Sequence, residues 1–315
     1  MTNLLMARDT LRNFYSRYEI FIFPVIKFLL ALITYLTINS RIGYMESLTS
    51  PVLSIMAALI NAVLPPGLII VFSALFIVLH IYRLSLVCAA LTLMLFIILF
   101  LAFFRFAPKN AITVVLMPLS FVMHVPFLVP MCTGLVGNPL SSLSVSCGVV
   151  VYYFLKFIVD NESVIRNPGD ATIAEQVTSI IGSIARNKNI LLFIIAFSVI
   201  IILVWLIRRL PVPHNWTIAI LAGGLVGLMA VLIGAIAMDL EVSVFSMIFN
   251  TILAIALGFV LQFFLFSVDF TRTEYVQFED EEYYYYVRAV PKISVSVSER
   301  RVKRVSKASK VSRTP

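Results

Sequence analysis

The chain has 315 residues, of which 61% are hydrophobic and only 13% are charged, with a formal net charge of +8. Ordinary soluble domains carry roughly a quarter charged residues, and large exposed apolar patches aggregate or mark interfaces. The composition therefore excludes a soluble globular protein and indicates an all-α polytopic membrane protein. In such a protein, excess Lys and Arg reports membrane topology, so we expect membrane lipid as a partner and no nucleic acid.

Residues 1–18 predict an amphipathic helix that lies in the membrane interface. Leu4, Leu11 and Phe14 recur at helical spacing, and three arginines occupy the rest of the helical wheel. A short soluble helix is the alternative. The first membrane span follows at about residues 20–38, where Lys27 is expected to extend toward the interface. These elements begin a transmembrane domain that we expect over residues 19–268.

The next apolar run, residues 51–64, is short for a membrane span. A helix of this length covers about 21 Å of a roughly 30 Å hydrocarbon core. Pro65-Pro66-Gly67 then turns the chain into a further short run, residues 67–82. The pattern predicts a tight hairpin and leaves open whether it crosses the membrane or is re-entrant.

A clean span at residues 84–104 precedes a run at residues 111–136 that is interrupted by Pro118, Pro126 and Pro130. Proline removes a helix donor and clashes with the preceding turn, so this run predicts a broken helix or a hairpin. Irregular backbone at membrane depth is tolerated where it lines a cavity or is buried in protein. The three prolines and His124 are therefore candidate cavity or gating residues. Alternatively, His124 is a core histidine bonded to a carbonyl that Pro126 or Pro130 leaves free.

Further spans are predicted at residues 140–159, 190–207, 216–238 and 242–268, with an extracytoplasmic loop at residues 160–189. Within this loop, Thr172 and Glu175 have the spacing of a helix capping box, and an amphipathic helix follows them. One later span carries a stripe of small residues that permits close helix approach. The stripe consists of Gly223, Gly227, Ala230, Gly234 and Ala237. Packing within the chain and homo-oligomerisation both remain open for it.

Basic residues set the predicted orientation. Arg208 and Arg209 and the basic tail favour the cytoplasm, so both termini are expected inside, with about 8–10 transmembrane or re-entrant helices. No acidic residue occurs between Glu46 and Asp160, and no HExxH, Walker A or GxSxG motif is present. We therefore expect no enzyme activity, no cofactor and no metal site.

Residues 269–315 form an expected cytoplasmic tail. Strands are predicted at residues 274–278 and 283–290, with a third at residues 293–298. The end of the tail is basic, low in hydrophobic content and expected to be disordered. Candidate interaction residues for a protein partner or anionic lipid are Glu281, Tyr283, Tyr284, Tyr285, Tyr286, Arg301 and Arg304.

The segment FEDEEYYYYVRAVPK resembles the tail of multi-spanning membrane proteins of Gram-positive bacteria that have no established activity. The resemblance implies a bacterial plasma-membrane location, and it carries over no functional residue. Two function hypotheses follow from the residues. One is a permease-like subunit of a transport system, suggested by the short run at 51–82 and the broken run at 111–136. The other is a non-enzymatic scaffold that recruits a cytoplasmic partner to its tail by strand addition.

Overall fold

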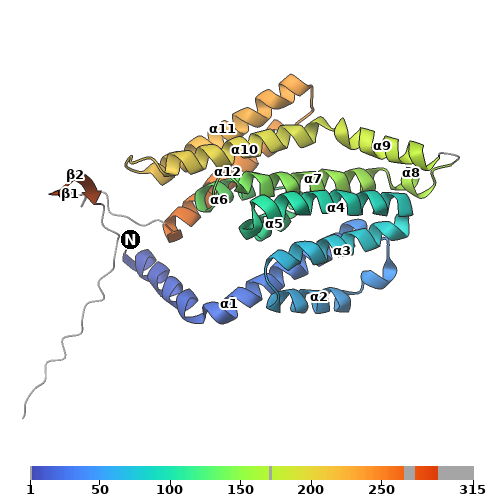
Figure 1. Ribbon diagram of the computed structural model, residues 1–315, viewed down its shortest axis with the longest axis horizontal. Helices are drawn as coiled ribbons and strands as arrows, with labels where there is room; N and C mark the ends of the chain where they lie inside the picture. The colour runs from blue at the N-terminus through green and yellow to red at the C-terminus, as the bar shows by residue number, and fades with distance from the viewer. Residues whose placement is uncertain (1, 170–171, 266–273, 290–315) are drawn as a thin grey trace, which may run out of the picture. The chain divides into compact units, whose positions relative to one another are not determined.

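The computed structural model describes residues 2–169, 172–265 and 274–289 (Figure 1). The chain divides into two units, residues 18–267 and a unit made of residues 1–17 and 268–315. The two units are described separately below. The predicted third strand, together with Arg301 and Arg304, falls outside the described residues.

The described helices follow the apolar runs of the sequence. They are α1 (Thr2–Ile42), α2 (Pro51–Val63), α3 (Gly67–Leu84), α4 (Leu86–Phe106), α5 (Ala111–Val122), α6 (Leu128–Val136), α7 (Ser141–Asp160), α8 (Glu162–Arg166), α9 (Ile173–Ala185), α10 (Lys188–Arg208), α11 (Asn215–Met238) and α12 (Val244–Leu265). The backbone of α1 is non-helical at Tyr18 (φ −113°, ψ 17°), where the two units meet along the chain.

Seven helices of the described part are long and apolar enough to cross a membrane. They are α1, α3, α4, α7, α11, α12 and the segment formed by α9 and α10, which counts as one. The prediction of a polytopic helical membrane protein is confirmed at this level. The remaining apolar helices α2, α5 and α6 are shorter, and proline-containing segments of the sequence set their limits.

Helices α2 and α3 form a hairpin that begins and ends beside the C-terminal end of α1 (Figure 1). The side-chain amide of Asn39 on α1 donates to the hydroxyl of Ser54 on α2 at 2.9 Å. Oδ1 of the same side chain lies 2.9 Å from Nε2 of His80, near the end of α3. At the tip of the hairpin, Lys27 Nζ donates to the carbonyl of Leu64 at 2.7 Å. The hairpin therefore turns at the depth of Lys27, part of the way along α1.

Helices α5 and α6 form a second hairpin, which begins and ends beside the N-terminal end of α7. Asn110, just before α5, donates to the hydroxyl of Ser141 at 2.8 Å. Helix α6 ends at Val136, and only residues 137–140 separate it from α7. Of the two possibilities for residues 111–136, the structure shows the hairpin.

The two hairpins start from opposite ends of the helix bundle. Tyr44, just after α1, lies near Glu162 and Arg166 of α8, which follows α7. Burial, and next the Glu162 carboxylate, raise the pKa of Tyr44 to about 12. The C-terminal ends of α1 and α7 therefore share one end of the bundle. The α2–α3 hairpin starts from that end, and the α5–α6 hairpin starts from the other.

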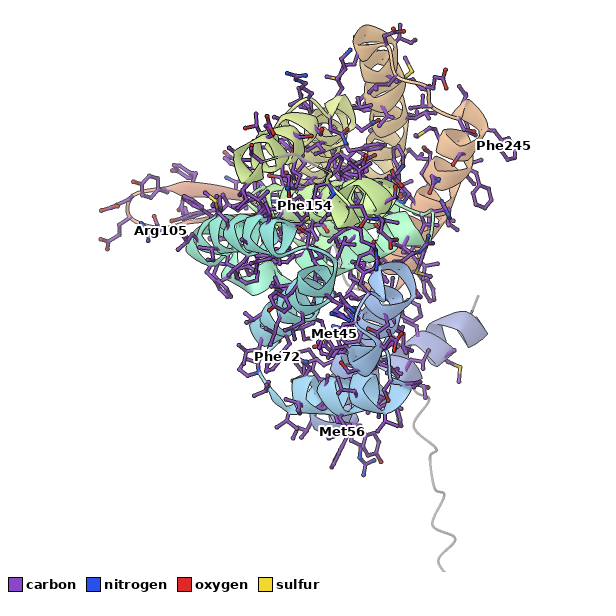
Figure 2. The ribbon with its side chains drawn as sticks, turned by 90° about the vertical axis from the view of Figure 1, so that its right-hand side faces the viewer. Met45, Met56, Phe72, Arg105, Phe154 and Phe245 are labelled. Carbon is purple, nitrogen blue, oxygen red and sulfur yellow. The ribbon has the colours of Figure 1, made fainter. Side chains whose placement is uncertain are left out.

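Two main hydrophobic clusters hold the bundle together, and α7 contributes to both. One joins α5, α6, α7, α10, α11 and α12 around residues such as Phe197 and Ile201. The other joins α1, α2, α3, α4, α7 and α9 around residues such as Tyr35 and Ile81. Figure 2 shows Phe154 of α7 inside the bundle, whereas Phe245 of α12 and Met56 of α2 point outward. Such an apolar periphery suits contact with lipid.

Helix α9 packs on α4 and α7 through its apolar face. Ile180 is buried there, and Ile184 is partly buried. The predicted capping box is present, because Thr172 Oγ1 accepts from the Glu175 N–H while a Glu175 carboxylate oxygen accepts from the Thr172 N–H. This helix lies over the end of the bundle where α7 terminates.

The second unit, made of residues 1–17 and 268–315, contains an antiparallel strand pair, β1 (Glu274–Glu279) and β2 (Tyr284–Ala289). These bounds confirm the two predicted strands to within one residue at each end. Asp280 holds the turn, because its carboxylate accepts from the N–H groups of Glu282 and Tyr283 and from the Tyr285 hydroxyl. The pairing register places Val276 and Phe278 on the same face as Tyr285 and Val287.

Candidate functional site

A cavity of about 270 Å³ lies among α1, α3, α4, α5 and α7. One helix of each hairpin, α3 and α5, contributes to its wall, so the two hairpins meet there. On α7 the lining residues extend from Cys147 to Asp160, which corresponds to about 20 Å of helix at 1.5 Å per residue. The cavity is therefore elongated along the bundle.

The wall of this cavity is apolar over most of its length. Helix α4 contributes Phe96, Phe100 and Phe103. Branched aliphatic side chains of α5 and α7, such as Val114 and Val151, face the same space. No residue with a permanent charge lines the cavity between Cys147 and Tyr152 on α7. This wall suits a hydrocarbon group better than an ion.

Among the described residues, the charged ones that line the cavity lie near the common end of α1 and α7. They are Arg41 in the last turn of α1, and Lys156 and Asp160 in the last turns of α7. All three are exposed, and none makes a side-chain hydrogen bond or ion pair with another residue that the structure describes. Arg41 and Asp160 lie within electrostatic range of Tyr152, which also lines the cavity. We call this end of the cavity, lined by Arg41, Lys156 and Asp160, its mouth; it carries two cations and one carboxylate.

His124 lines the cavity at the tip of the α5–α6 hairpin. It has a left-handed backbone with φ 59°. Its N–H donates to the Phe121 carbonyl at 3.1 Å, and the Val125 N–H donates to the Ser120 carbonyl at 2.8 Å. This is a Schellman motif, in which glycine usually takes the position of His124.

The side chain of His124 is exposed and makes no hydrogen bond with the described residues. It is therefore not the buried histidine bonded to a freed carbonyl that the sequence left open as an alternative. A non-glycine residue in the left-handed region carries a backbone cost that often accompanies a functional position. This cost marks His124 as the strained residue on the cavity wall.

The short helices α2 and α6 each end at a cation supplied by a long helix. Lys27 of α1 is 6% exposed and donates to the carbonyl of Leu64, the residue that caps α2. Arg208 of α10 donates to the carbonyls of Leu135 and Gly137 at the end of α6. Carbonyls at a helix C-terminus carry partial negative charge, so a cation there is stabilising. Each cation thereby satisfies backbone carbonyls at a helix end, Lys27 part of the way along α1 and Arg208 at the end of the bundle where α7 begins.

His80 is the fully buried histidine of the described chain. Its Nδ1 accepts from the N–H of Met45 at 3.2 Å, so Nε2 carries the proton and donates to Asn39 Oδ1 at 2.9 Å. The amide nitrogen of Asn39 donates its two protons to the Leu48 carbonyl and to Ser54 Oγ. This network ties α1, α2 and α3 together outside the cavity wall. No local sequence pattern indicates this network, because Asn39, Ser54 and His80 lie on three different helices.

The other candidate residues lie at different places. Pro118 lines the cavity, whereas Pro126 lies in the hairpin turn and Pro130 in the first turn of α6, and neither lines it. Gly223, Gly227 and Gly234 lie against Val204, Ile200 and Leu192 of α10, and Ala230 is partly buried. The stripe therefore packs within the chain.

The tail residues belong to the strand pair of the other unit. Tyr284, Tyr285 and Tyr286 are part of β2, while Glu281 and Tyr283 lie in the turn that precedes it. Their side chains are exposed. Within the described residues, no group of three or more His, Cys, Asp or Glu side chains is placed to hold a metal ion.

Comparison with protein-family models, with curated proteins and with solved structures finds no match to this chain. The functional argument therefore depends on the geometry of the cavity and of the strand pair.

Proposed function

We propose that the protein is a permease-like component of a transport system in a bacterial plasma membrane, with both termini on the cytoplasmic side. One observation supports it most: two hairpins of short helices start from opposite ends of the bundle and meet at an elongated cavity. Transporters commonly place their substrate site near the membrane midplane, beside discontinuous helices that enter from opposite sides. Re-entrant hairpins and full spans together make up the expected 8–10 helices.

The orientation proposal follows some of the basic residues of the bundle, whereas Arg83 and Arg186 lie at the outer end and are exceptions to the positive-inside rule. In this arrangement Arg208 and Arg209 lie at the cytoplasmic end, with the beginning of α7, and Arg41 lies at the outer end. Arg105, at the end of α4, also lies on the cytoplasmic side, as the positive-inside rule favours. The mouth of the cavity, beside Arg41 and Asp160, then faces outward.

The test is cysteine accessibility in vesicles of both orientations. In a variant without native cysteines, a single cysteine replaces Val151 in the cavity, and the matched control replaces Ile33, an exposed apolar residue of α1 that does not line it. A membrane-impermeant thiol reagent is added from one face at a time. Transport requires that Val151→Cys reacts from both faces and that Ile33→Cys reacts from neither. Reaction of Val151→Cys from one face only, with and without a membrane potential, would contradict the proposal.

The strand pair supports a second candidate, a non-enzymatic scaffold that binds a cytoplasmic partner. Val276, Phe278 and Val287 are exposed on one face of a two-stranded sheet, which is marginally stable on its own. A strand from a partner would pair with a free edge of this sheet, and an apolar surface from a partner would cover the exposed face. Pull-down of the full chain and of a chain lacking residues 270–315 tests the idea. Loss of every co-purifying protein in the shorter chain supports the scaffold, and retention of all of them contradicts it.

A further inference from the structure

The chemistry of the cavity is divided along its length. Its inner part is lined by phenylalanines of α4 and by Cys147, and its mouth by Arg41, Lys156 and Asp160. A purely apolar ligand would leave the two cations without a partner, and a small ion would leave the long apolar wall in contact with water. An amphiphile with an anionic head matches both parts, because its chain replaces water along the wall and its head meets the excess positive charge.

The dimensions select the number and length of the chains. From Lys156 to Cys147 the wall extends about 13 Å along α7, and from Asp160 to Cys147 about 20 Å. An extended chain of single bonds advances about 1.2 Å per bond, so a chain of about 11 to 16 carbons covers this length. A methylene group occupies about the volume of one liquid water molecule, roughly 30 Å³. A cavity of about 270 Å³ thus holds about nine such groups, enough for one chain with the rest in the mouth.

We infer that the cavity binds a single-chain amphiphile with an anionic head group, with the head beside Arg41 and Lys156 and the chain directed toward Cys147. This inference rests on the proposed function and names its substrate class. The carboxylate of Asp160 reduces the positive charge of the mouth without cancelling it, so the head carries a single acidic group such as a carboxylate or a phosphate ester. His124 lines the cavity and can donate a further hydrogen bond to the ligand.

The experiment measures binding of radiolabelled dodecanoate to the full chain in nanodiscs of phosphatidylcholine, with empty nanodiscs subtracted. Dodecyl phosphate and dodecanol serve as competitors with the same chain and a different head. The double variant Arg41→Gln/Lys156→Gln removes both cations. Its matched control is Arg83→Gln, which removes an exposed cation from the last turn of α3 that does not line the cavity. Val151→Trp fills the cavity from α7.

We expect one dodecanoate per chain, displaced by dodecyl phosphate. The double variant should bind dodecanoate at least tenfold more weakly and dodecanol unchanged, and Arg83→Gln should match the parent chain. Val151→Trp should lose all three ligands, and its thermal unfolding shows whether it is folded. The double variant changes only exposed side chains, so it should fold like the parent chain. The test therefore does not depend on whether Val151→Trp folds. Equal dodecanoate affinity in the double variant and the parent chain would overturn the inference.

A further arm separates the sources of the ligand. Part of the phosphatidylcholine is replaced by phosphatidylglycerol, an anionic lipid with two chains. Unchanged dodecanoate binding supports a single-chain ligand, and displacement by phosphatidylglycerol shows that a bilayer phospholipid fills the cavity instead. The transport proposal fails separately. If dodecanoate binds but Val151→Cys reacts from one face only, the cavity is a binding site and the transport proposal fails. If Val151→Cys reacts from both faces but dodecanoate does not bind, the transport proposal stands and the substrate class is wrong.

Discussion

Replacing Arg208 by glutamine tests how the α5–α6 hairpin is held. The guanidinium donates to the carbonyls of Leu135 and Gly137, and glutamine is too short to replace either bond. Hydrogen bonds from a charged donor contribute about 1.5–3 kcal/mol in water-soluble proteins, and hydrogen bonds between membrane helices contribute about 0.6–2 kcal/mol. We therefore expect the free energy of unfolding to fall by roughly 2–4 kcal/mol. Reversible unfolding in mixed micelles measures this change, and hydrogen exchange should accelerate in residues 128–137.

The neighbouring arginine supplies the control. Arg209 lies over the Trp205 ring at 4.4 Å. Replacing it by glutamine removes the same charge from the same end of α10, at a cost of about 0.5–1 kcal/mol for the lost cation–π contact. If Arg208→Gln destabilises the chain no more than Arg209→Gln, or if exchange in α6 stays unchanged, Arg208 does not cap α6 and the reasoning is wrong.

Three further predictions concern single side chains. Lys27→Met removes the cation that donates to the Leu64 carbonyl. We therefore expect the free energy of unfolding to fall by about 1–2 kcal/mol and hydrogen exchange in α2 to become faster. Unchanged exchange in α2 would contradict the capping role of Lys27. His124 has a left-handed backbone, which costs a non-glycine residue roughly 1 kcal/mol. His124→Gly removes this cost, so the thermal unfolding temperature should rise by about 2 °C. A decrease would show instead that the His124 side chain stabilises the turn. The Tyr285 hydroxyl and two backbone N–H groups lower the pKa of Asp280, so the ionised carboxylate stabilises the strand pair. This stabilisation is complete above the ordinary carboxyl pKa and is lost as the pH falls through the lowered pKa. Amide chemical shifts of β1 and β2 recorded between about pH 2 and 5 should show this loss, and Asp280→Asn should remove it.

Much of the architecture could be predicted from local sequence. Continuous apolar runs mark the spans, Pro65-Pro66-Gly67 marks a turn between helices, and Thr172 with Glu175 marks the start of α9. Aromatic, β-prone stretches on either side of an acidic cluster mark the two strands of the tail. Each of these signals depends on residues close together in the chain, which is why the sequence alone reveals them.

The polar contacts that fix the hairpins could not be predicted in the same way. Lys27 was expected to extend toward the interface, yet it binds a carbonyl 37 residues further along the chain. Arg208 indicated only orientation, and its partners on α6 lie more than 70 residues away. Likewise, His124 could be identified as a candidate from its proline-rich surroundings, but Arg41 and Lys156 join it at the cavity only because α1, α5 and α7 pack together. Such contacts depend on helix order in space, which a single sequence does not specify.

The glycine contacts have a mechanical consequence. A Cβ atom at Gly227 would lie 2.5 Å from Cδ1 of Ile200, one at Gly134 would lie 2.9 Å from Cβ of Val204, and one at Gly148 would lie 2.5 Å from Cβ of Met117. These positions lock α11 and α6 to α10, and α7 to α5, with almost no room to slide. At Gly67, on α3, the nearest atom to such a Cβ lies 3.7 Å away. Helices α5, α6, α7, α10 and α11 are thus closely packed at these glycines, and we expect a change in the width of the cavity to come from α1, α3 and α4 moving against them.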